Sequence, residues 1–163
     1  MGTTSASATN QARWIAALRI LMGIYFLYAG IPKLMGVLGI SHEPFKLTNA
    51  LDMMVKSAWP SWYHSFLTSF ALPHAAVFGW LVALGEVAVG AGLVLGLFTR
   101  LSAGIGVFLN ANYFFATFYG FARFPNLWYT VLHLLFIGTA AGRTWGLDAL
   151  VVPRLPKWLR WLG

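Results

Sequence analysis

Ionisable and amide side chains inside long apolar stretches are the strongest candidates for chemistry in this 163-residue sequence. They are Arg19, Glu86, Asn112 and His133. Such groups are costly to place among apolar residues, so they are usually paired or functional. Because a helix rises about 1.5 Å per residue, Glu86, Asn112 and His133 are expected at similar depths, as one polar layer. Arg19 is expected nearer one end, from which its long side chain can extend toward this layer or back to the surface.

The polar layer has two interpretations. In the first, it binds a quinone head group or passes a proton, and Glu86 is the candidate catalytic group, as proton acceptor. In the second, it is a hydrogen-bonded network that only fixes how the helices pack. Glu86 shares a helix face with the small residues Gly79, Ala83 and Gly90, so we expect it to face other helices rather than lipid.

Metal and haem sites are not expected. A single buried histidine such as His133 is more often a hydrogen-bonding core residue than a ligand. Haem held between two helices needs a second histidine, and His42, His64 and His74 lie outside the apolar stretches or at an edge. The four acidic residues are scattered. The chain has no cysteine, which excludes disulfides, thiolate-bound iron–sulfur clusters and cysteine-based sulfur transfer within it.

The stretches that carry these residues predict an all-α membrane protein. Only 9% of the residues are charged, whereas soluble domains carry about 25%. Four apolar stretches approach the ~20 residues needed to span hydrocarbon. They cover residues 14–40, 74–98, 101–119 and 127–142. We therefore predict a single membrane domain, residues 1–163, built as a four-transmembrane-helix bundle.

Three further features modify this plan. Pro32 lies inside the first stretch and predicts a kink there or a helix end near Lys33. Residues 41–73 carry apolar residues at helical spacing, then several aromatic ones, which predicts an amphipathic interfacial segment lying on the membrane surface. Residues 153–163 combine tryptophan and leucine with arginine and lysine, which is typical of a basic amphipathic tail.

The basic residues predict the orientation of the chain. One side would hold Arg13, Arg100, Arg143, Arg154, Lys157 and Arg160, and the other Lys46, Lys56 and Arg123, while Lys33 is ambiguous. Because cytoplasmic loops carry the excess of basic residues, we predict a multi-pass protein of the cell inner membrane with both termini in the cytoplasm. The net charge of +7 is explained by orientation and by contact with anionic lipids, so no nucleic-acid partner is expected.

Several short motifs together resemble the DoxX-like family, which includes the DoxD-type subunit of thiosulfate:quinone oxidoreductase. They are Arg19-Ile20-Leu21-Met22-Gly23, Ala29-Gly30-Ile31-Pro32-Lys33, Leu95-Gly96-Leu97-Phe98-Thr99-Arg100-Leu101 and Ala141-Gly142-Arg143-Thr144-Trp145-Gly146-Leu147-Asp148. The resemblance implies a four-helix membrane protein tied to electron transfer at the quinone pool, often alongside other subunits.

Five residues of these motifs are expected to be structural. Gly96 and Arg100 would close the second span, with a small residue for packing and a cation at the negative end of the helix dipole. Gly142 allows a tight turn after the fourth span. Arg143 and Asp148 flank that turn, and we expect them to form an ion pair.

The leading hypothesis is a small integral membrane subunit of a larger redox complex, respiratory or photosynthetic, with a structural or quinone-proximal role rather than a catalytic one. Its expected partners are membrane lipids, including bound lipid, and other membrane-protein subunits. No intrinsic cofactor is expected, and quinone is the candidate ligand. Two alternatives stand beside it: a stand-alone quinone-reducing oxidoreductase of the DoxX/DoxD type, and a small transporter, for which four helices leave little room.

Overall fold

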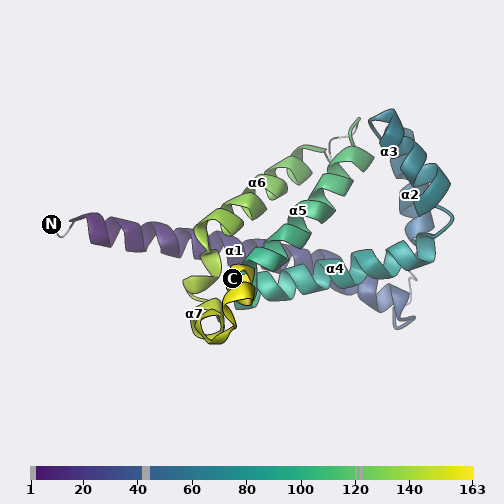
Figure 1. The fold of residues 1–163 in the computed structure, drawn as a ribbon. Coiled ribbons are helices and arrows are strands. Elements are labelled where there is room, and N and C mark those ends of the chain that lie inside the picture. Colours follow the sequence, from purple (N-terminus) through teal and green to yellow (C-terminus); the bar gives the residue numbers. More distant parts are fainter. Residues whose placement is uncertain (1–2, 42–44, 120, 122) are drawn as a thin grey trace.

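Helices form the regular structure of the chain in the computed structural model, which describes residues 3–41, 45–119, 121 and 123–163 (Figure 1). Within these residues no strand occurs, so the all-α prediction is confirmed. The longest helices are α1 (Thr3–Val37), α4 (Ala75–Leu95), α5 (Thr99–Ala116) and α6 (Arg123–Thr139). Shorter helices connect α1 to α4 and follow α6.

Small residues bring α1 and α4 together along their length (Figure 1). A Cβ atom added to Gly23 would lie 2.7 Å from the backbone nitrogen of Val94, and one added to Gly90 would lie 2.8 Å from that of Leu27. Backbones approach this closely only where glycine leaves room, which is a common way for helices to associate in lipid. The other long helices add to this pair, because α5 packs on α4 and α6 packs on α5.

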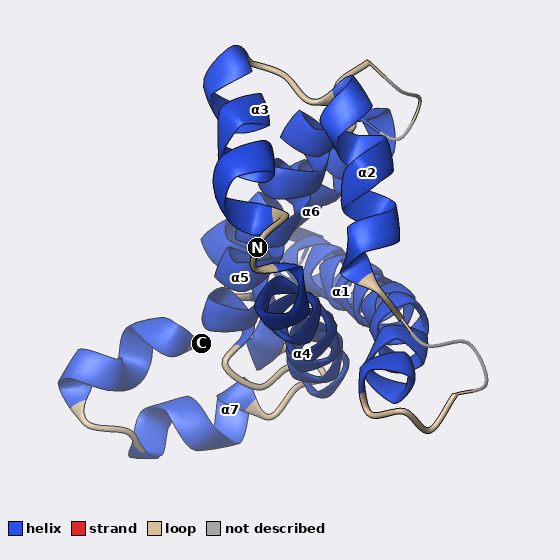
Figure 2. Ribbon diagram, turned by 90° about the vertical axis from the view of Figure 1, so that its right-hand side faces the viewer, coloured by secondary structure: helices blue, strands red, loops and turns tan. Residues whose placement is uncertain are grey.

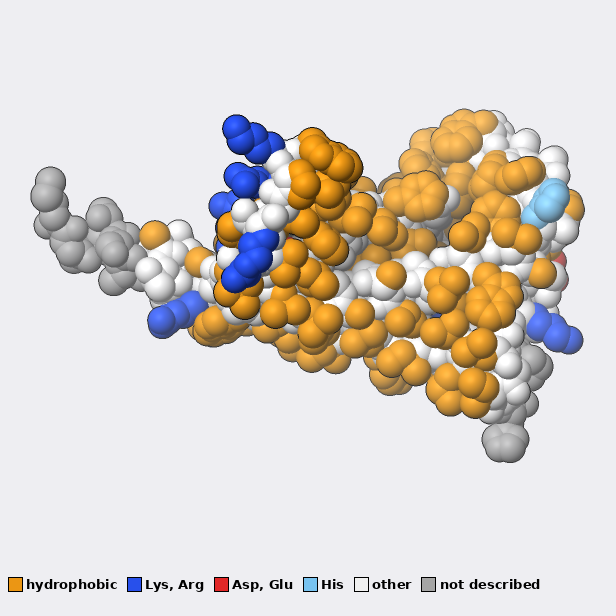
Figure 3. All heavy atoms as spheres, turned by 60° about the horizontal axis from the view of Figure 1, so that its bottom comes forward, with side chains coloured by type: hydrophobic (Ala, Val, Ile, Leu, Met, Phe, Trp, Pro, Cys, Tyr) orange, Lys and Arg blue, Asp and Glu red, His pale blue; other side chains and the backbone are white. Residues whose placement is uncertain are grey.

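Two helices meet the length and apolarity of a membrane span: residues Ala8–Val37 of α1, and α4. The outer surface agrees with a lipid environment, because Figure 3 shows apolar side chains over most of one face of the molecule. The third and fourth crossings, assigned to stretches that now correspond to α5 and α6, stay predictions.

Pro32 does not end the first helix. α1 continues through Pro32 to Val37, so the expected end near Lys33 is wrong. A proline removes one backbone donor, but a helix in apolar surroundings keeps its remaining hydrogen bonds because no water competes for them. The extra turn places Lys33 on the helix, where it contacts α4.

The segment between α1 and α4 folds into α2 (Leu47–Ser57), α3 (Ser61–Phe66) and a π-helical turn, η1 (Leu67–Ala71). Leu47 and Leu51 of α2 are buried, and they belong to an apolar cluster that also contains Tyr63, Leu67 and Ala116. Figure 2 shows α2 and α3 together at one end of the molecule. The predicted amphipathic helix is therefore present, and its inner face covers the ends of α4 and α5. Its position at the membrane surface stays a prediction.

The C-terminal segment lies at the opposite end (Figure 1). It contains η2 (Ala141–Arg143), α7 (Asp148–Val151), η3 (Val152–Arg154) and η4 (Lys157–Leu162). The turn between α4 and α5 holds this segment in place, because Leu147 and Asp148 donate backbone hydrogen bonds to the carbonyl oxygens of Leu95 and Gly96. Trp158 and Trp161 project outward from the basic tail.

Candidate functional site

Lys33, Glu86 and Tyr113 form a hydrogen-bonded polar cluster between α1, α4 and α5. The Lys33 Nζ atom lies 2.5 Å from Glu86 Oε1 and 2.6 Å from Oε2. The Tyr113 hydroxyl donates to Glu86 Oε1 at 2.8 Å, and Lys33 Nζ lies 3.4 Å from the same hydroxyl oxygen. Glu86 thus accepts hydrogen bonds on both carboxylate oxygens, which offsets part of the cost of burying this side chain.

The surrounding helices position this cluster. Glu86 lies on the buried face of α4 with Gly79, Ala83 and Gly90, so the prediction that it faces other helices is confirmed. On α1, Gly30 leaves room for the carboxylate side chain, since a Cβ atom there would lie 2.8 Å from Glu86 Cβ. The Glu86 side chain is 4% exposed and that of Lys33 is 26% exposed. The pair is therefore shielded from solvent chiefly on the Glu86 side.

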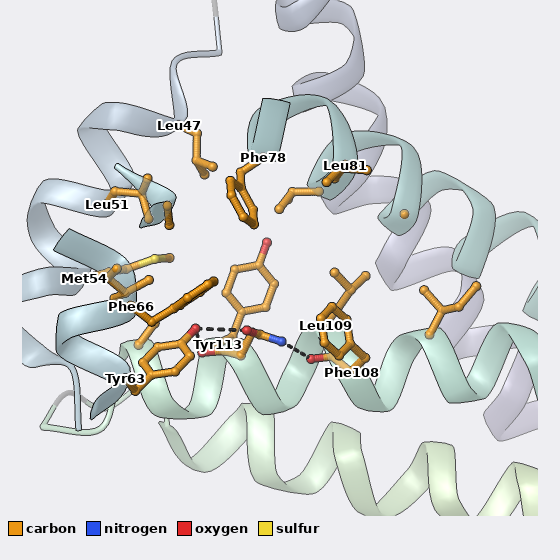
Figure 4. Close-up of a pocket in the computed structure, with 17 residues that line it drawn as sticks. Leu47, Leu51, Met54, Tyr63, Phe66, Phe78, Leu81, Phe108, Leu109 and Tyr113 are labelled. Carbon is orange, nitrogen blue, oxygen red and sulfur yellow. Dashed lines mark hydrogen bonds between the residues drawn. The ribbon is translucent and has the colours of Figure 1, made fainter. Parts of the chain in front are cut away.

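A cavity of about 320 Å³ adjoins the cluster. Its lining comes from α2, α3, η1, α4 and α5, and is almost entirely apolar and aromatic. The lining residues are Leu47, Leu51, Met54, Tyr63, Phe66, Leu67, Ala71, Phe78, Leu81, Val82, Gly85, Ile105, Phe108, Leu109, Asn112, Tyr113 and Ala116. In Figure 4 the Tyr113 ring stands among them, with its hydroxyl directed between Phe78 and Leu81. This hydroxyl links the cavity to the Glu86 carboxylate.

Asn112 and Tyr63 supply the other polar atoms of the cavity wall. The Tyr63 hydroxyl lies 3.1 Å from both Asn112 Oδ1 and the Asn112 carbonyl oxygen and donates toward them. The Asn112 amide donates in turn to the carbonyl of Phe108 at 2.7 Å. Burial raises the pKa of Tyr63 to about 12, so this hydroxyl keeps its proton and its role as donor at neutral pH.

His133 lies apart from this cavity, at the contact between α5 and α6. It is fully buried, and its ring packs edge-on against Phe26. His133 Nδ1 donates to the carbonyl of Tyr129 at 2.6 Å, and Nε2 has no partner among the described residues. Gly106 of α5 faces the ring so closely that a Cβ atom would overlap it. Asn110 donates to the carbonyl of Gly106 at 2.8 Å, within α5.

Arg19 lies at the other end of the bundle and does not reach the expected layer. Its fully buried guanidinium donates to the carbonyl oxygens of Leu93, Val94, Thr144 and Trp145. These carbonyls belong to the last turn of α4 and to the turn before α7. Arginine suits this position because its five donors lie in one plane and can bind several acceptors at once. The structure therefore separates Arg19 and His133 from Glu86, and brings Asn112 to the cavity beside Tyr113.

The expected ion pair between Arg143 and Asp148 is wrong. Asp148 instead accepts backbone hydrogen bonds from Phe98 at 2.7 Å and Thr99 at 3.0 Å, and so caps the N-terminus of α5. Gly142 lies against this carboxylate with no room for a side chain. Arg143 is exposed.

Gly96 and Arg100 do not act together at the end of the second span. Gly96 ends α4 in the left-handed conformation, with φ of 60°, as expected of a C-terminal glycine. Arg100, however, donates through Nε to the carbonyl of Ile137 at 3.0 Å, near the end of α6. The cation therefore binds the C-terminal end of α6, where the helix dipole also favours positive charge, rather than that of α4.

Lys33, Tyr113 and Tyr63 were not selected from the sequence. Lys33 had a detectable signal, because a lysine and a carboxylate each placed in an apolar stretch tend to pair. Tyr113 had none, since tyrosine is frequent near membrane interfaces for other reasons. Within the described residues, no three His, Asp or Glu side chains lie close enough to hold a metal ion.

Comparison with known proteins gives a family. The DoxX family model matches residues 14–119, which is more than half of the chain. The matched part includes Lys33, Glu86 and Tyr113 and every residue that lines the cavity. The chain matches neither a curated protein sequence nor a solved structure. By the extent of the family match, the chain belongs to the DoxX family.

Proposed function

We propose that this protein is a small integral membrane subunit of a larger redox complex and that it binds a quinone in the cavity beside Tyr113. The family suggests a membrane protein of redox-related type. The observation that carries the quinone proposal is an apolar, aromatic cavity of about 320 Å³ with the Tyr113 hydroxyl in its wall and the Lys33–Glu86 ion pair one hydrogen bond behind it. Ligand pockets of about 300–1,000 Å³, mostly apolar with a few polar groups, are typical of small-molecule sites.

The chemistry of a quinone fits this lining. A quinone has a flat ring that packs against aromatic side chains, two oxygen atoms that need polar partners, and an apolar tail. Phe66, Phe78 and Phe108 supply aromatic surface. Asn112 and Tyr113 supply polar atoms for the oxygen atoms of the quinone or of its reduced form. The Glu86 carboxylate next to Tyr113 gives a proton acceptor one hydrogen bond away from the cavity.

The subunit proposal rests on the need for a partner that exchanges electrons with the quinone. Changing the redox state of a quinone requires an electron donor or acceptor. The sequence has no cysteine, so it cannot hold a thiolate-bound iron–sulfur cluster itself. We infer that a partner protein supplies or takes the electrons, and that this chain places the quinone next to the partner.

The orientation proposed for the chain has four crossings, α1, α4, α5 and α6, with both termini in the cytoplasm. In support, basic side chains gather at the end that carries the C-terminal segment (Figure 3). Arg100, at the start of α5, lies at that same end. The membrane in this proposal is the inner membrane of the cell. The cavity, formed partly by α2 and α3, would then lie in the half of that membrane away from the cytoplasm.

A stand-alone quinone-reducing oxidoreductase is the second candidate, because Glu86 is already connected to the cavity through Tyr113. Purification in mild detergent separates the two candidates. A subunit should co-purify with at least one other membrane protein. A lone chain that turns over quinone, and loses turnover in the Glu86→Gln variant, would favour the enzyme instead.

Quinone binding is tested by filling the cavity. Gly85 lines it, and a Cβ atom there would make ordinary contact with Leu109 at 3.5 Å, so Gly85→Leu would extend into the cavity without a backbone clash. Gly104 of α5 has no atom within 4 Å of its added Cβ, so Gly104→Leu is the matched control. With protein in lipid nanodiscs and a benzoquinone carrying a ten-carbon tail, Gly85→Leu should weaken binding at least about tenfold. Equal binding by both variants would contradict the site.

A further inference from the structure

The direction of one hydrogen bond determines what the cavity offers to a ligand. The Tyr113 hydroxyl lies 2.8 Å from Glu86 Oε1, and a carboxylate can only accept, so the tyrosine proton points at Glu86. The hydroxyl oxygen that faces the cavity therefore presents a lone pair. Lys33 donates an N–H to the same oxygen at 3.4 Å, which occupies one of its lone pairs and leaves the other for a ligand.

Most of the other donors in the wall and directly behind it are already engaged. Lys33 Nζ directs its protons at both Glu86 oxygens and at Tyr113. The Tyr63 hydroxyl donates to Asn112, and the Asn112 amide donates to the carbonyl of Phe108, which leaves one amide N–H. Asn112 Oδ1 and the tyrosine oxygens are acceptors with lone pairs to spare. The polar face of the cavity is thus mostly accepting.

We propose that the cavity selects the reduced form of its ligand, a hydroquinone, over the oxidised quinone. This inference rests on the proposed quinone site. A hydroquinone carries O–H groups, one of which donates to the Tyr113 oxygen, whereas a quinone carries only carbonyl acceptors. A carbonyl opposite the Tyr113 oxygen would leave two acceptors facing each other in an apolar cavity, and unmatched buried polar groups are costly.

Tyr113 does not adapt cheaply to the oxidised form. To donate to a quinone carbonyl, its hydroxyl would have to turn away from Glu86. That turn breaks a charge-assisted hydrogen bond, which is stronger than a bond between neutral groups. It also removes one of the bonds that stabilise a carboxylate whose side chain is 4% exposed. The ion pair thereby makes Tyr113 a specificity-determining residue.

The test compares two affinities of the unmodified protein in lipid nanodiscs. Under anaerobic conditions, binding of a benzoquinone with a ten-carbon tail and of its hydroquinone is measured by equilibrium dialysis with chromatographic detection. The hydroquinone should bind about tenfold tighter, the difference expected for one matched hydrogen bond. Equal affinities, or tighter binding of the quinone, would overturn the inference and leave the proposed site standing. Binding of neither form would overturn both.

One variant tests whether the preference for hydroquinone depends on Tyr113. Tyr113→Phe should lower hydroquinone affinity about tenfold and leave quinone affinity unchanged or raise it, because only the reduced form donates to the hydroxyl oxygen and the oxidised form loses an opposing acceptor. Tyr28→Phe is the matched control, since Tyr28 is 80% exposed on α1 and lies outside the cavity. If Tyr113→Phe weakened both forms equally, or kept the preference, the assignment to Tyr113 would be wrong.

Discussion

At the scale of single residues, the pairing of Lys33 with Glu86 decides the character of the site. The two side chains carry opposite charges between α1 and α4, and each satisfies the other at 2.5–2.6 Å. Neither charge is tolerated alone in such surroundings, so the pair and the Tyr113 hydroxyl behave as one unit. The unit sets both the polarity of the cavity wall and the position of Tyr113.

Replacing Lys33 by methionine should destabilise the fold. The substitution leaves Glu86 buried without its cation, which costs on the order of 3 kcal/mol for a buried pair. Replacing both residues, as Lys33→Met with Glu86→Leu, should recover most of the loss because no charge is then stranded. Thermal unfolding in detergent measures both effects. Lys56→Met on the exposed face of α2 is the control. A single variant as stable as this control would contradict the account.

The orientation of a residue could be predicted where its neighbours on the same helix face indicate it. The stripe of small residues around Glu86 gave its orientation, and the structure confirms it. The partner of Glu86 was not found in the same way, because Pro32 left it open whether the first helix is kinked or ends near Lys33. The partners of Arg19 could not be predicted for a different reason: the carbonyl groups of the turn before α7, which accept its hydrogen bonds, lie far away in the sequence.

At the scale of elements, the contact between α5 and α6 depends on a glycine facing a histidine. Gly106 gives His133 the room that its ring occupies. Gly106→Ala should therefore destabilise the protein by about 1–3 kcal/mol, the range for overfilled cores, because His133 is enclosed by Phe26 and Phe136 and cannot move aside freely. Thermal unfolding is the measurement. Gly104→Ala, two residues away in open space, should be neutral or slightly stabilising.

The cap on α5 gives a second prediction for the elements. Asp148 binds the backbone N–H groups of Phe98 and Thr99, so Asp148→Ala should cost about 1–2 kcal/mol and loosen the C-terminal segment. Hydrogen exchange at the first turn of α5 should rise in this variant. Asp52→Ala, on the exposed face of α2, should leave that exchange unchanged. No difference between the variants would show that the cap is not needed.

Elements were predictable to the extent that periodicity and apolar length define them. The long helices overlap the four predicted stretches, although α1, α5 and α6 begin before residues 14, 101 and 127. What joins the elements was not predictable, since Arg100 binds the end of α6 rather than that of α4, and Asp148 caps a helix rather than pairing with Arg143. Both contacts depend on how the C-terminal segment returns to the turn between α4 and α5, which local sequence does not encode.

At the scale of the whole molecule, the basic end and the cavity end are expected on opposite sides of the membrane. The chain has no cysteine, so single introduced cysteines can be labelled without background. In intact cells, a membrane-impermeant maleimide should label the Lys56→Cys variant. The Lys157→Cys variant should be labelled only after permeabilisation, because Lys157 belongs to the basic tail placed in the cytoplasm. The reverse pattern would invert the proposed orientation.

The cavity belongs to this scale, because no single element contains it. Leu51 of α2, Tyr63 of α3, Phe78 of α4 and Phe108 of α5 all contribute to its lining. A sequence pattern reports which face of one helix is apolar, but it does not report the gap left where several such faces meet. Asn112 was selected for its polarity and does line the cavity, whereas its neighbour Tyr113, which connects the cavity to Glu86, became recognisable only in three dimensions.

The most direct test of the central claim is photochemical labelling of the protein with an azido-benzoquinone, followed by mapping of the adducts by mass spectrometry. The account predicts adducts on cavity residues such as Phe66, Phe108 and Tyr113, and their loss when unlabelled hydroquinone competes. Adducts confined to outward-facing residues such as Trp128 and Leu134, with no effect of the competitor, would contradict it.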